Sequence, residues 1–316
     1  MPKPKNLVIS GGGISGLGII GILKYLNEKN LLVNIDNYIG TSVGSIICFF
    51  LSLDFNINEL IEFVCNFDFS KILDNLDIDN LFDKWGFSNS EKLEYLIMRM
   101  IQIKNINSDI TFKEHFELTG KNLIITGTCL NESKAYYFNH ERNPNMKILL
   151  AICISCAVPV VFEPIKYDDK LWLDGGIIDN YPINYFEDEI DFTLGITVTE
   201  KYFEKKKNDI NELNDFLLSI FKCGSYVFQN YMIDKFKDNT IKLTNDISSF
   251  GNFKLDEKER IKMVEYGYVE ANKQNEILEQ FFIEDETFIS SETSDSSIEM
   301  ILLSSSDESS SDDETL

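Results

Sequence analysis

Short apolar runs alternate with longer amphipathic segments through the first fifty residues of the chain. Residues 7–9 are apolar and end at glycines, which is typical of a buried strand. Residues 16–30 carry isoleucine and leucine at helical spacing before a polar end, and they predict a helix. Residues 38–39 predict the end of a second strand, and residues 45–53 predict a buried helix. This order of elements predicts parallel strands within an α/β sheet.

The rest of the chain continues this pattern after a polar, largely helical segment over residues 54–120. Within that segment, Ser88 to Glu91 and Thr111 to Glu114 each fit a capping box, and the second helix should end at Gly120. The later strands are predicted at residues 123–129, 135–138, 160–166, 171–173 and 192–198. The later helices are predicted at residues 145–155, 210–235 and 256–282.

The chain has 316 residues and a formal net charge of −23, which limits the classes of partner. Binding of nucleic acid needs clustered Lys and Arg, so no nucleic acid is expected as the main partner. Residues 284–316 are rich in serine and acidic residues and contain no Lys or Arg, so they predict a disordered tail. Serines followed by acidic residues suit an acid-directed kinase, and a passive solubilising role is the alternative.

The apolar segments are too short to anchor the chain in a bilayer. The longest run, residues 46–53, is far shorter than the about 20 residues that span a membrane, and the chain shows no signal-peptide pattern. We therefore expect a soluble, intracellular and cytoplasmic protein whose six cysteines are buried thiols. Cys153 and Cys156 form a C-x-x-C pair without the second half of a metal site. The frequent Asn, Ile, Lys, Phe and Tyr indicate an AT-rich genome, such as that of a giant virus or a protist.

A G-x-S-x-G pentapeptide lies between the second predicted strand and the buried helix. It runs from Gly40 to Gly44 and places Ser42 at its centre. A strand–turn–helix context of this kind holds a serine on a sharp elbow with its hydroxyl exposed. We interpret Ser42 as a nucleophile, and the alternative is a glycine-rich turn with a serine that faces solvent.

A glycine run precedes the elbow and has two interpretations. Gly11, Gly13 and Gly16 satisfy the G-x-G-x-x-G fingerprint of dinucleotide-binding folds. That interpretation requires an acidic residue at the end of the second strand, whereas Asp36 lies before that strand. We therefore favour the second interpretation, in which the N–H groups of Gly12 and Gly13 form an oxyanion hole. The helix that starts near Gly16 would add its positive end.

A serine nucleophile needs a base, and the chain has only two histidines. His115 and His140 lie in polar segments, and we interpret both as surface residues. Asp174 is the better candidate because it ends an apolar run and is followed by Gly175 and Gly176. Active-site residues of open α/β sheets gather at such strand ends, and an aspartate can act directly on a serine. A structural turn aspartate is the alternative.

In this order, the glycine run, the serine elbow and the Asp174 turn resemble the patatin-like phospholipase family. Residues 111–114, 155–164 and 176–182 also fit, and the resemblance covers roughly residues 6–190. It implies a three-layer α/β fold whose central, mostly parallel sheet is flanked by helices. It also implies a Ser42–Asp174 dyad with Gly11 to Gly13 as the oxyanion loop, supported by Gly16, Gly40, Gly44, Gly175 and Gly176.

The same resemblance implies what the chain acts on, and together with the composition it predicts how the chain is divided. We expect a carboxylic-ester hydrolase of the phospholipase A or lysophospholipase type, without a metal or other cofactor, that contacts a membrane surface transiently. Residues 6–190 would form the catalytic domain, with the helical insertion at about 54–120. Residues 191–283 would complete it as a mainly helical α/β segment, before the tail at 284–316.

One residue departs from the family pattern. The family commonly has Arg or Lys just before the last glycine of the first motif, and this chain has Ser15. Hydrolysis of acyl esters in general is therefore a firmer expectation than activity on charged phospholipids. The alternative is a patatin-fold protein with weak or no catalysis that binds lipids or has a regulatory role.

Overall fold

The computed structural model describes residues 3–72, 83–200, 213–245 and 254–281. All of them belong to one compact unit, Met1–Ile283. The disordered tail predicted at 284–316 lies outside the described residues. The division of the catalytic segment at residue 190 stays a prediction.

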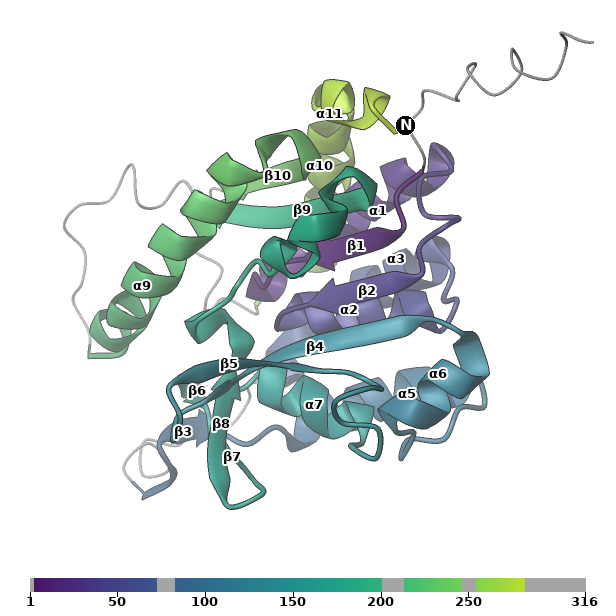
Figure 1. Cartoon of the computed structure of the whole chain (residues 1–316). Coiled ribbons are helices and arrows are strands. Elements are labelled where there is room, and N and C mark those ends of the chain that lie inside the picture. Colours follow the sequence, from purple (N-terminus) through teal and green to yellow (C-terminus); the bar gives the residue numbers. More distant parts are fainter. Residues whose placement is uncertain (1–2, 73–82, 201–212, 246–253, 282–316) are drawn as a thin grey trace, which may run out of the picture. The chain divides into compact units, whose positions relative to one another are not determined.

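Eight strands among the described residues form the central sheet (Figure 1). They are β1 (Asn6–Ile9), β2 (Asn37–Gly40), β4 (Asn122–Cys129), β5 (Lys134–Phe138), β7 (Ile165–Tyr167), β8 (Lys170–Asp174), β9 (Thr193–Glu200) and β10 (Thr240–Asn245). The order is β10-β9-β1-β2-β4-β8-β7, with β5 also paired to β4. From β10 to β4 each pair is parallel, whereas β5, β8 and β7 pair in antiparallel fashion. The sheet is therefore mostly parallel, as expected.

Helices cover both faces of this sheet. The α-helices are α1 (Gly16–Glu28), α2 (Val43–Ser52), α3 (Ile57–Asn66), α5 (Glu91–Ile103), α6 (Phe112–Thr119), α7 (Ile148–Ser155), α9 (Leu213–Lys235), α10 (Glu257–Lys273) and α11 (Asn275–Glu279). Short 3-10 helices are η1 (Gly13–Ser15), η2 (Phe69–Ile72), η3 (Gly175–Ile177), η4 (Ile183–Phe192) and η5 (Lys237–Asn239). A second, two-stranded sheet joins β3 (Gly86–Ser88) to β6 (Val160–Phe162).

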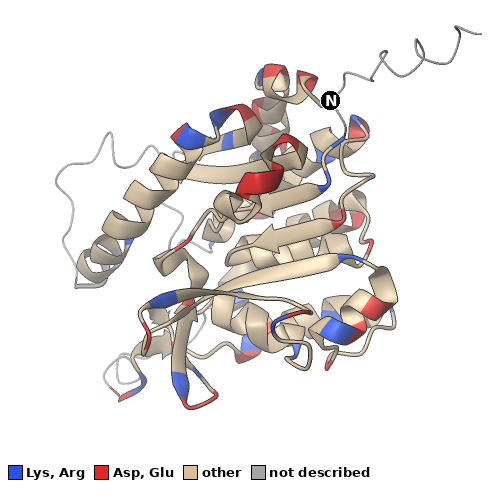
Figure 2. Cartoon of the chain, in the orientation of Figure 1, with Lys and Arg blue, Asp and Glu red and all other residues tan. Residues whose placement is uncertain are grey.

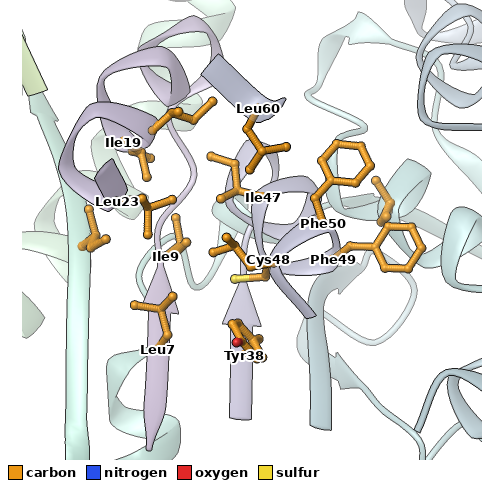
Figure 3. Packing of buried hydrophobic residues seen from close by; sticks show 14 of the residues in the cluster. Leu7, Ile9, Ile19, Leu23, Tyr38, Ile47, Cys48, Phe49, Phe50 and Leu60 are labelled. Carbon is orange, nitrogen blue, oxygen red and sulfur yellow. The ribbon is translucent and has the colours of Figure 1, made fainter. Parts of the chain in front are cut away.

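Alternation along the central strands explains the three layers. Leu7 and Ile9 of β1 belong to the larger apolar cluster, together with residues of α1 and α2. Figure 3 shows Ile9 next to Leu23 of α1, with Leu7 farther back along the same strand. Val8, between them, belongs to a second cluster that includes residues of η4 and α9. Because successive side chains of a strand point to opposite faces, both faces of the sheet are buried.

The charged residues follow the same division. Strands β1, β2 and β4 contain no charged residue, and Figure 2 shows them tan between helices that carry red and blue positions.

Helices α1 and α10 approach closely on one face of the sheet. A Cβ on Gly21 would lie 1.9 Å from the Val264 carbonyl oxygen, and one on Gly267 would lie 1.8 Å from the Gly18 oxygen. Glycine at both positions permits this backbone contact.

Several local details differ from the predictions, including the helix predicted at 256–282, which is divided into α10 and α11. The capping box predicted at Ser88 is wrong, because Ser90 is the N-cap of α5 and its side chain makes no capping hydrogen bond. The helix predicted from residue 145 begins at Ile148. The run at 160–166 forms two strands, β6 and β7. Strand β10 was not predicted, although it forms one edge of the central sheet. The capping box at Thr111 and the helix end at Gly120 are confirmed.

Candidate active site

Ser42 lies at the turn between β2 and α2, where it is the N-cap of the helix. Its backbone angles, φ 53° and ψ −125°, place a non-glycine residue in a strained conformation. The glycines on either side allow the turn to close. A Cβ on Gly40 would lie 2.4 Å from the Gly44 carbonyl carbon, and one on Gly44 would lie 2.4 Å from the Ile9 oxygen. The predicted serine elbow is therefore present as a sharp turn between a strand and a helix.

Asp174 ends β8 and is buried. Its Oδ1 accepts a hydrogen bond of 2.7 Å from the Gly176 N–H. Burial raises the pKa of its carboxyl to about 7, against the smaller lowering effects of the Gly176 N–H and the Ser42 hydroxyl. Its Oδ2 makes no hydrogen bond of ordinary geometry with a described residue, although the Ser42 hydroxyl is near enough to influence the pKa. One carboxyl oxygen is therefore fixed and the other remains able to take a proton.

Backbone contacts hold Asp174 in place. Its N–H donates to the Ala157 carbonyl oxygen at 2.9 Å, and its own carbonyl oxygen accepts from the Thr128 hydroxyl at 2.9 Å. The same block of chain supports the elbow, because the Ser42 N–H donates to Ser155 Oγ at 2.9 Å. Residues 155–157 thus connect the two predicted catalytic positions. The sequence indicated this block as a unit, but not these individual contacts.

A small cavity of about 50 Å³ brings the predicted residues together. Ser42, Asp174, Gly11, Gly12 and Gly176 all line it. Gly16, Gly40, Gly44 and Gly175 do not line it and instead allow close packing around it. A Cβ on Gly16, for example, would lie 2.5 Å from a methyl carbon of Val43.

The three glycines of the first motif have different surroundings. The Gly11 N–H donates to the Asn180 carbonyl oxygen at 3.1 Å, so this donor is already used. No backbone oxygen of a described residue accepts a hydrogen bond from the N–H of Gly12 or Gly13. A Cβ on Gly11 would lie 2.3 Å from Asn180 Oδ1 and 3.3 Å from the Ser42 Cβ, so a side chain would enter the cavity. Gly12 and Gly13 therefore retain the donors.

Sequence reasoning missed the contribution of α9 to this cavity. Phe221, Lys222, Ser225, Tyr226 and Gln229 of this helix line it. Gln229 is central because its Oε1 accepts from Asn180 Nδ2 at 3.0 Å and its Nε2 donates to the Val198 oxygen at 2.9 Å. No local signal marks these residues, because their role depends on where a distant helix packs.

A second cavity of about 140 Å³ also begins at Ser42. Apart from Ser42 itself, its lining contains only glycine, cysteine and apolar residues. The other lining residues are Gly13, Ile14, Gly16, Leu17, Ile20, Val43, Ile46, Ile47, Phe50, Phe63, Val64, Phe69, Ile72, Leu93, Leu96, Ile97, Met100, Cys156, Val158 and Phe162. Several come from α3, η2 and α5, so the helical insertion forms one side of this cavity. Such a lining suits a hydrocarbon chain.

The histidines lie elsewhere. His115 is buried rather than on the surface, and its Nε2 lies 2.8 Å from Ser52 Oγ. Burial lowers the pKa of this imidazole to about 4. His140 stacks on Phe116 with ring centroids 3.8 Å apart. Neither lines either cavity, so the structure does not bring a histidine to Ser42.

The cysteines are the remaining candidates that the sequence offered. Cys48, Cys129, Cys153 and Cys156 are buried and Cys65 is partly buried. The prediction is wrong for Cys223, which is exposed on α9.

Within the described ranges, no group of three or more His, Cys, Asp or Glu is arranged to hold a metal ion. Nor does any helix in that part of the chain have the length and apolarity needed to cross a bilayer.

Comparison with known proteins finds a matching family model and several similar sequences. A family model described as Patatin-like phospholipase matches residues 7–187. The chain is 32% identical over 283 residues to the uncharacterized protein R571 of Acanthamoeba polyphaga mimivirus, covering 85% of this chain and 93% of that protein. It is 32% identical over 248 residues to the probable lipid hydrolase 463L of Invertebrate iridescent virus 6, covering 77% and 78%. Triacylglycerol lipase 4 of Saccharomyces cerevisiae is 26% identical over 79% of this chain, but only 28% of that enzyme is covered.

Solved structures show the same fold. VipD from Legionella pneumophila superposes with a TM-score of 0.61 at 16% identity, covering 89% of this chain and 67% of VipD. The type III effector ExoU gives a TM-score of 0.50 at 15% identity, covering 89% and 54%. These likenesses confirm the expected α/β fold with its central sheet between helices.

Proposed function

This chain belongs to the patatin-like phospholipase family, and from that premise we propose that it hydrolyses carboxylic-ester bonds of lipids through Ser42 and Asp174. One observation carries the proposal. Ser42 lies where a cavity containing a buried carboxyl meets an apolar cavity able to hold an acyl chain. The relatives named as a probable lipid hydrolase and a triacylglycerol lipase support the same class of reaction.

In the proposed reaction, Ser42 Oγ attacks the ester carbonyl carbon and its proton passes to Asp174 Oδ2. The N–H groups of Gly12 and Gly13 stabilise the oxyanion, since Gly11 already donates to Asn180. Collapse of the tetrahedral intermediate breaks the bond to the alcohol, which takes the proton from Asp174. Water then attacks the acyl-enzyme, gives a proton to Asp174, and releases the fatty acid while the proton returns to Ser42.

The environment of Asp174 suits this role. A carboxylate with the ordinary pKa of 3.8 is a weak base, and burial raises the pKa to about 7. Because the base must be ionised, the value of kcat/KM should rise with pH and level off above pH 7 or so. Activity that stayed constant between pH 5 and pH 8 would contradict this role.

Ser15 does not change the charge of the site. Its side chain is completely buried and lines neither cavity. The absence of a basic residue at this position therefore leaves the nucleophile, the carboxyl and the oxyanion donors unaltered. This observation favours catalysis over a purely regulatory role. We retain the finer proposal of a phospholipase A or lysophospholipase type because of the family to which the chain belongs.

Contact with a membrane surface is proposed through the outer face of α9. Phe216, Ile220, Val227 and Tyr231 are each at least half exposed. At 3.6 residues per turn they fall within about 60° of one another, on the side of the helix opposite the cavity-lining residues. An exposed apolar stripe of this kind suits transient insertion into a lipid interface. It would hold the cavity close to lipid substrates.

The decisive assay is release of fatty acid from defined lipids by the full chain. Phospholipids, lysophospholipids, monoacylglycerols and triacylglycerols would be tested separately, with products identified by mass spectrometry. Ser42→Ala should lower the rate about 10⁴-fold or more. Ser133→Ala is the matched control, because Ser133 is exposed in the turn between β4 and β5 and lines neither cavity. Equal release by wild type and Ser42→Ala would reject the assignment.

A further inference from the structure

The apolar cavity that begins at Ser42 follows helix α2 inward. Four of its lining residues lie at helical spacing on one side of that helix, and they are Val43, Ile46, Ile47 and Phe50. The first two are partly exposed, whereas Ile47 and Phe50 are buried. The cavity therefore opens beside the proposed nucleophile and ends among buried side chains.

Helix α5 lines the same cavity with a stripe of equal length. Its lining residues are Leu93, Leu96, Ile97 and Met100, again at helical spacing. Each stripe extends over seven residue steps, which is about 10 Å at the rise of an α-helix. The two helices therefore indicate the same depth for the cavity.

Phe50 is the lining residue of α2 that lies farthest from Ser42. Its side chain is 4% exposed, and its ring lies with its centroid 5.1 Å from that of Phe55, which is also buried. Close packing of this kind leaves the ring little room to move. Phe50 thus forms a fixed wall at the inner end of the α2 stripe.

We propose that Phe50 limits the length of the acyl chain that the cavity accepts, so that esters of medium-chain fatty acids are the preferred substrates. The proposal rests on the proposed function, because it places the ester carbonyl at Ser42. A staggered hydrocarbon chain advances about 1.25 Å per carbon–carbon bond, so a depth of about 10 Å holds about eight carbons.

The volume of the cavity agrees with this length. The cavity measures about 140 Å³. A cavity of about 150 Å³ with a Leu, Ile and Phe lining holds a six-carbon ring. Length and volume together indicate acyl chains of about six to ten carbons. The remaining carbons of a longer chain would stay in water or would have to displace the Phe50 ring.

The first test measures kcat/KM for para-nitrophenyl esters from butanoyl to tetradecanoyl, each below its micelle concentration. For wild type the value should rise about fourfold per added methylene up to octanoyl or decanoyl, and then stop rising. Phe50→Leu should move this maximum to a chain about two carbons longer. A rise that continues to tetradecanoyl in wild type, or an unchanged maximum in Phe50→Leu, would overturn the proposal.

A second variant tests the same limit from the opposite direction. Ile47 lies about one helical turn closer to Ser42 than Phe50 does. Ile47→Phe adds atoms to an existing cavity, so it should fold, and it should move the maximum to a chain about three carbons shorter. A maximum at the wild-type length in folded Ile47→Phe would contradict a length limit set along α2.

Phe49→Leu is the matched control. Phe49 precedes Phe50 in α2 and is also buried, but it lines neither cavity. The two leucine variants lose the same atoms from the core, so their thermal stability should fall by similar amounts. Only Phe50→Leu should change the preferred chain length. An equal shift in Phe49→Leu would assign the effect to loosened packing and would overturn the proposal.

Binding to inactive protein separates this proposal from the proposed hydrolysis. Ser42→Ala would be titrated by calorimetry with straight-chain primary alcohols of the same chain lengths. Affinity should rise up to about eight to ten carbons and then level off, and Ser42→Ala/Phe50→Leu should extend the rise. This pattern would uphold the length limit even if wild type cleaves no ester. An affinity that rises through the longest alcohol would overturn the limit even if esters are cleaved.

Discussion

Replacement of Asp174 by asparagine should stabilise the folded chain at neutral and alkaline pH while it removes the proposed base. The Asp174 side chain is buried, and its Oδ1 accepts the Gly176 N–H at 2.7 Å. An asparagine amide oxygen can keep this hydrogen bond. The substitution therefore removes chiefly a negative charge that burial disfavours. Stability and catalysis should change in opposite directions.

The size and sign follow from proton binding. The pKa of Asp174 is about 7 in the folded chain, against 3.8 for an ordinary aspartate. Between these values the folded state holds the proton more tightly than the unfolded state, so the free energy of unfolding falls as the pH rises. The loss is about 1.4 kcal/mol per pH unit well below pH 7, and about 2 kcal/mol between pH 5 and pH 7. The substituted asparagine would not titrate, and its amide adds a cost of about 1 to 3 kcal/mol that does not depend on pH.

The assay is urea unfolding of wild type and Asp174→Asn at pH 5, 6, 7 and 8, followed by tryptophan fluorescence. The free energy of unfolding of the variant minus that of wild type should increase by about 3 kcal/mol from pH 5 to pH 8. Asp179→Asn is a matched control, because burial raises the pKa of that carboxyl to only about 6. The difference in unfolding free energy between this variant and wild type should therefore stop increasing at a lower pH. A difference that is constant, or that falls with pH, would refute the reasoning.

Three further predictions concern the surroundings of the site. Gly11→Ala should lower kcat about 10²-fold or more, because its Cβ would lie 2.3 Å from Asn180 Oδ1; wild-type kinetics would contradict this crowding. His115→Ala removes the contact with Ser52 and should lower the free energy of unfolding by about 1 to 3 kcal/mol. Labelling of the chain by an active-site probe should not change. Loss of labelling in folded protein would give this histidine a catalytic role. Ile220→Gln/Val227→Gln should lower the ratio of turnover on vesicles to turnover on a soluble ester about tenfold, and an unchanged ratio would exclude this face of α9 from lipid contact.

The fold near the nucleophile was predictable because it depends on short-range chemistry. The apolar run of β1, the glycines that follow it and the elbow at Ser42 are specified within fifty residues. Strand β10 was not predictable in this way. Only Ile241 and Leu243 within it are buried apolar residues, and its place beside β9 arises from the packing of the whole sheet.

The same distinction applies to the site. Ser42 and Asp174 each lie in a glycine-marked turn, so local sequence indicated both before their proximity was known. Lys222 and Gln229 carry no such mark, because both lie within a 23-residue helix rather than at a turn. Their position at the cavity depends on contacts between α9 and the sheet, including the one from Gln229 to the Val198 oxygen. His115 was assigned to the surface for a similar reason, since its neighbour Ser52 lies 63 residues away.

The central claim is that Ser42 is a nucleophile activated within this cavity. A fluorophosphonate probe tests it most directly, because the probe forms a stable adduct only with an activated serine. Full-length wild type should carry one adduct, which peptide mass spectrometry should locate at Ser42. Ser42→Ala, shown to be folded by its thermal unfolding, should carry none. An adduct of equal yield on Ser42→Ala, or an adduct located at another serine, would contradict the account.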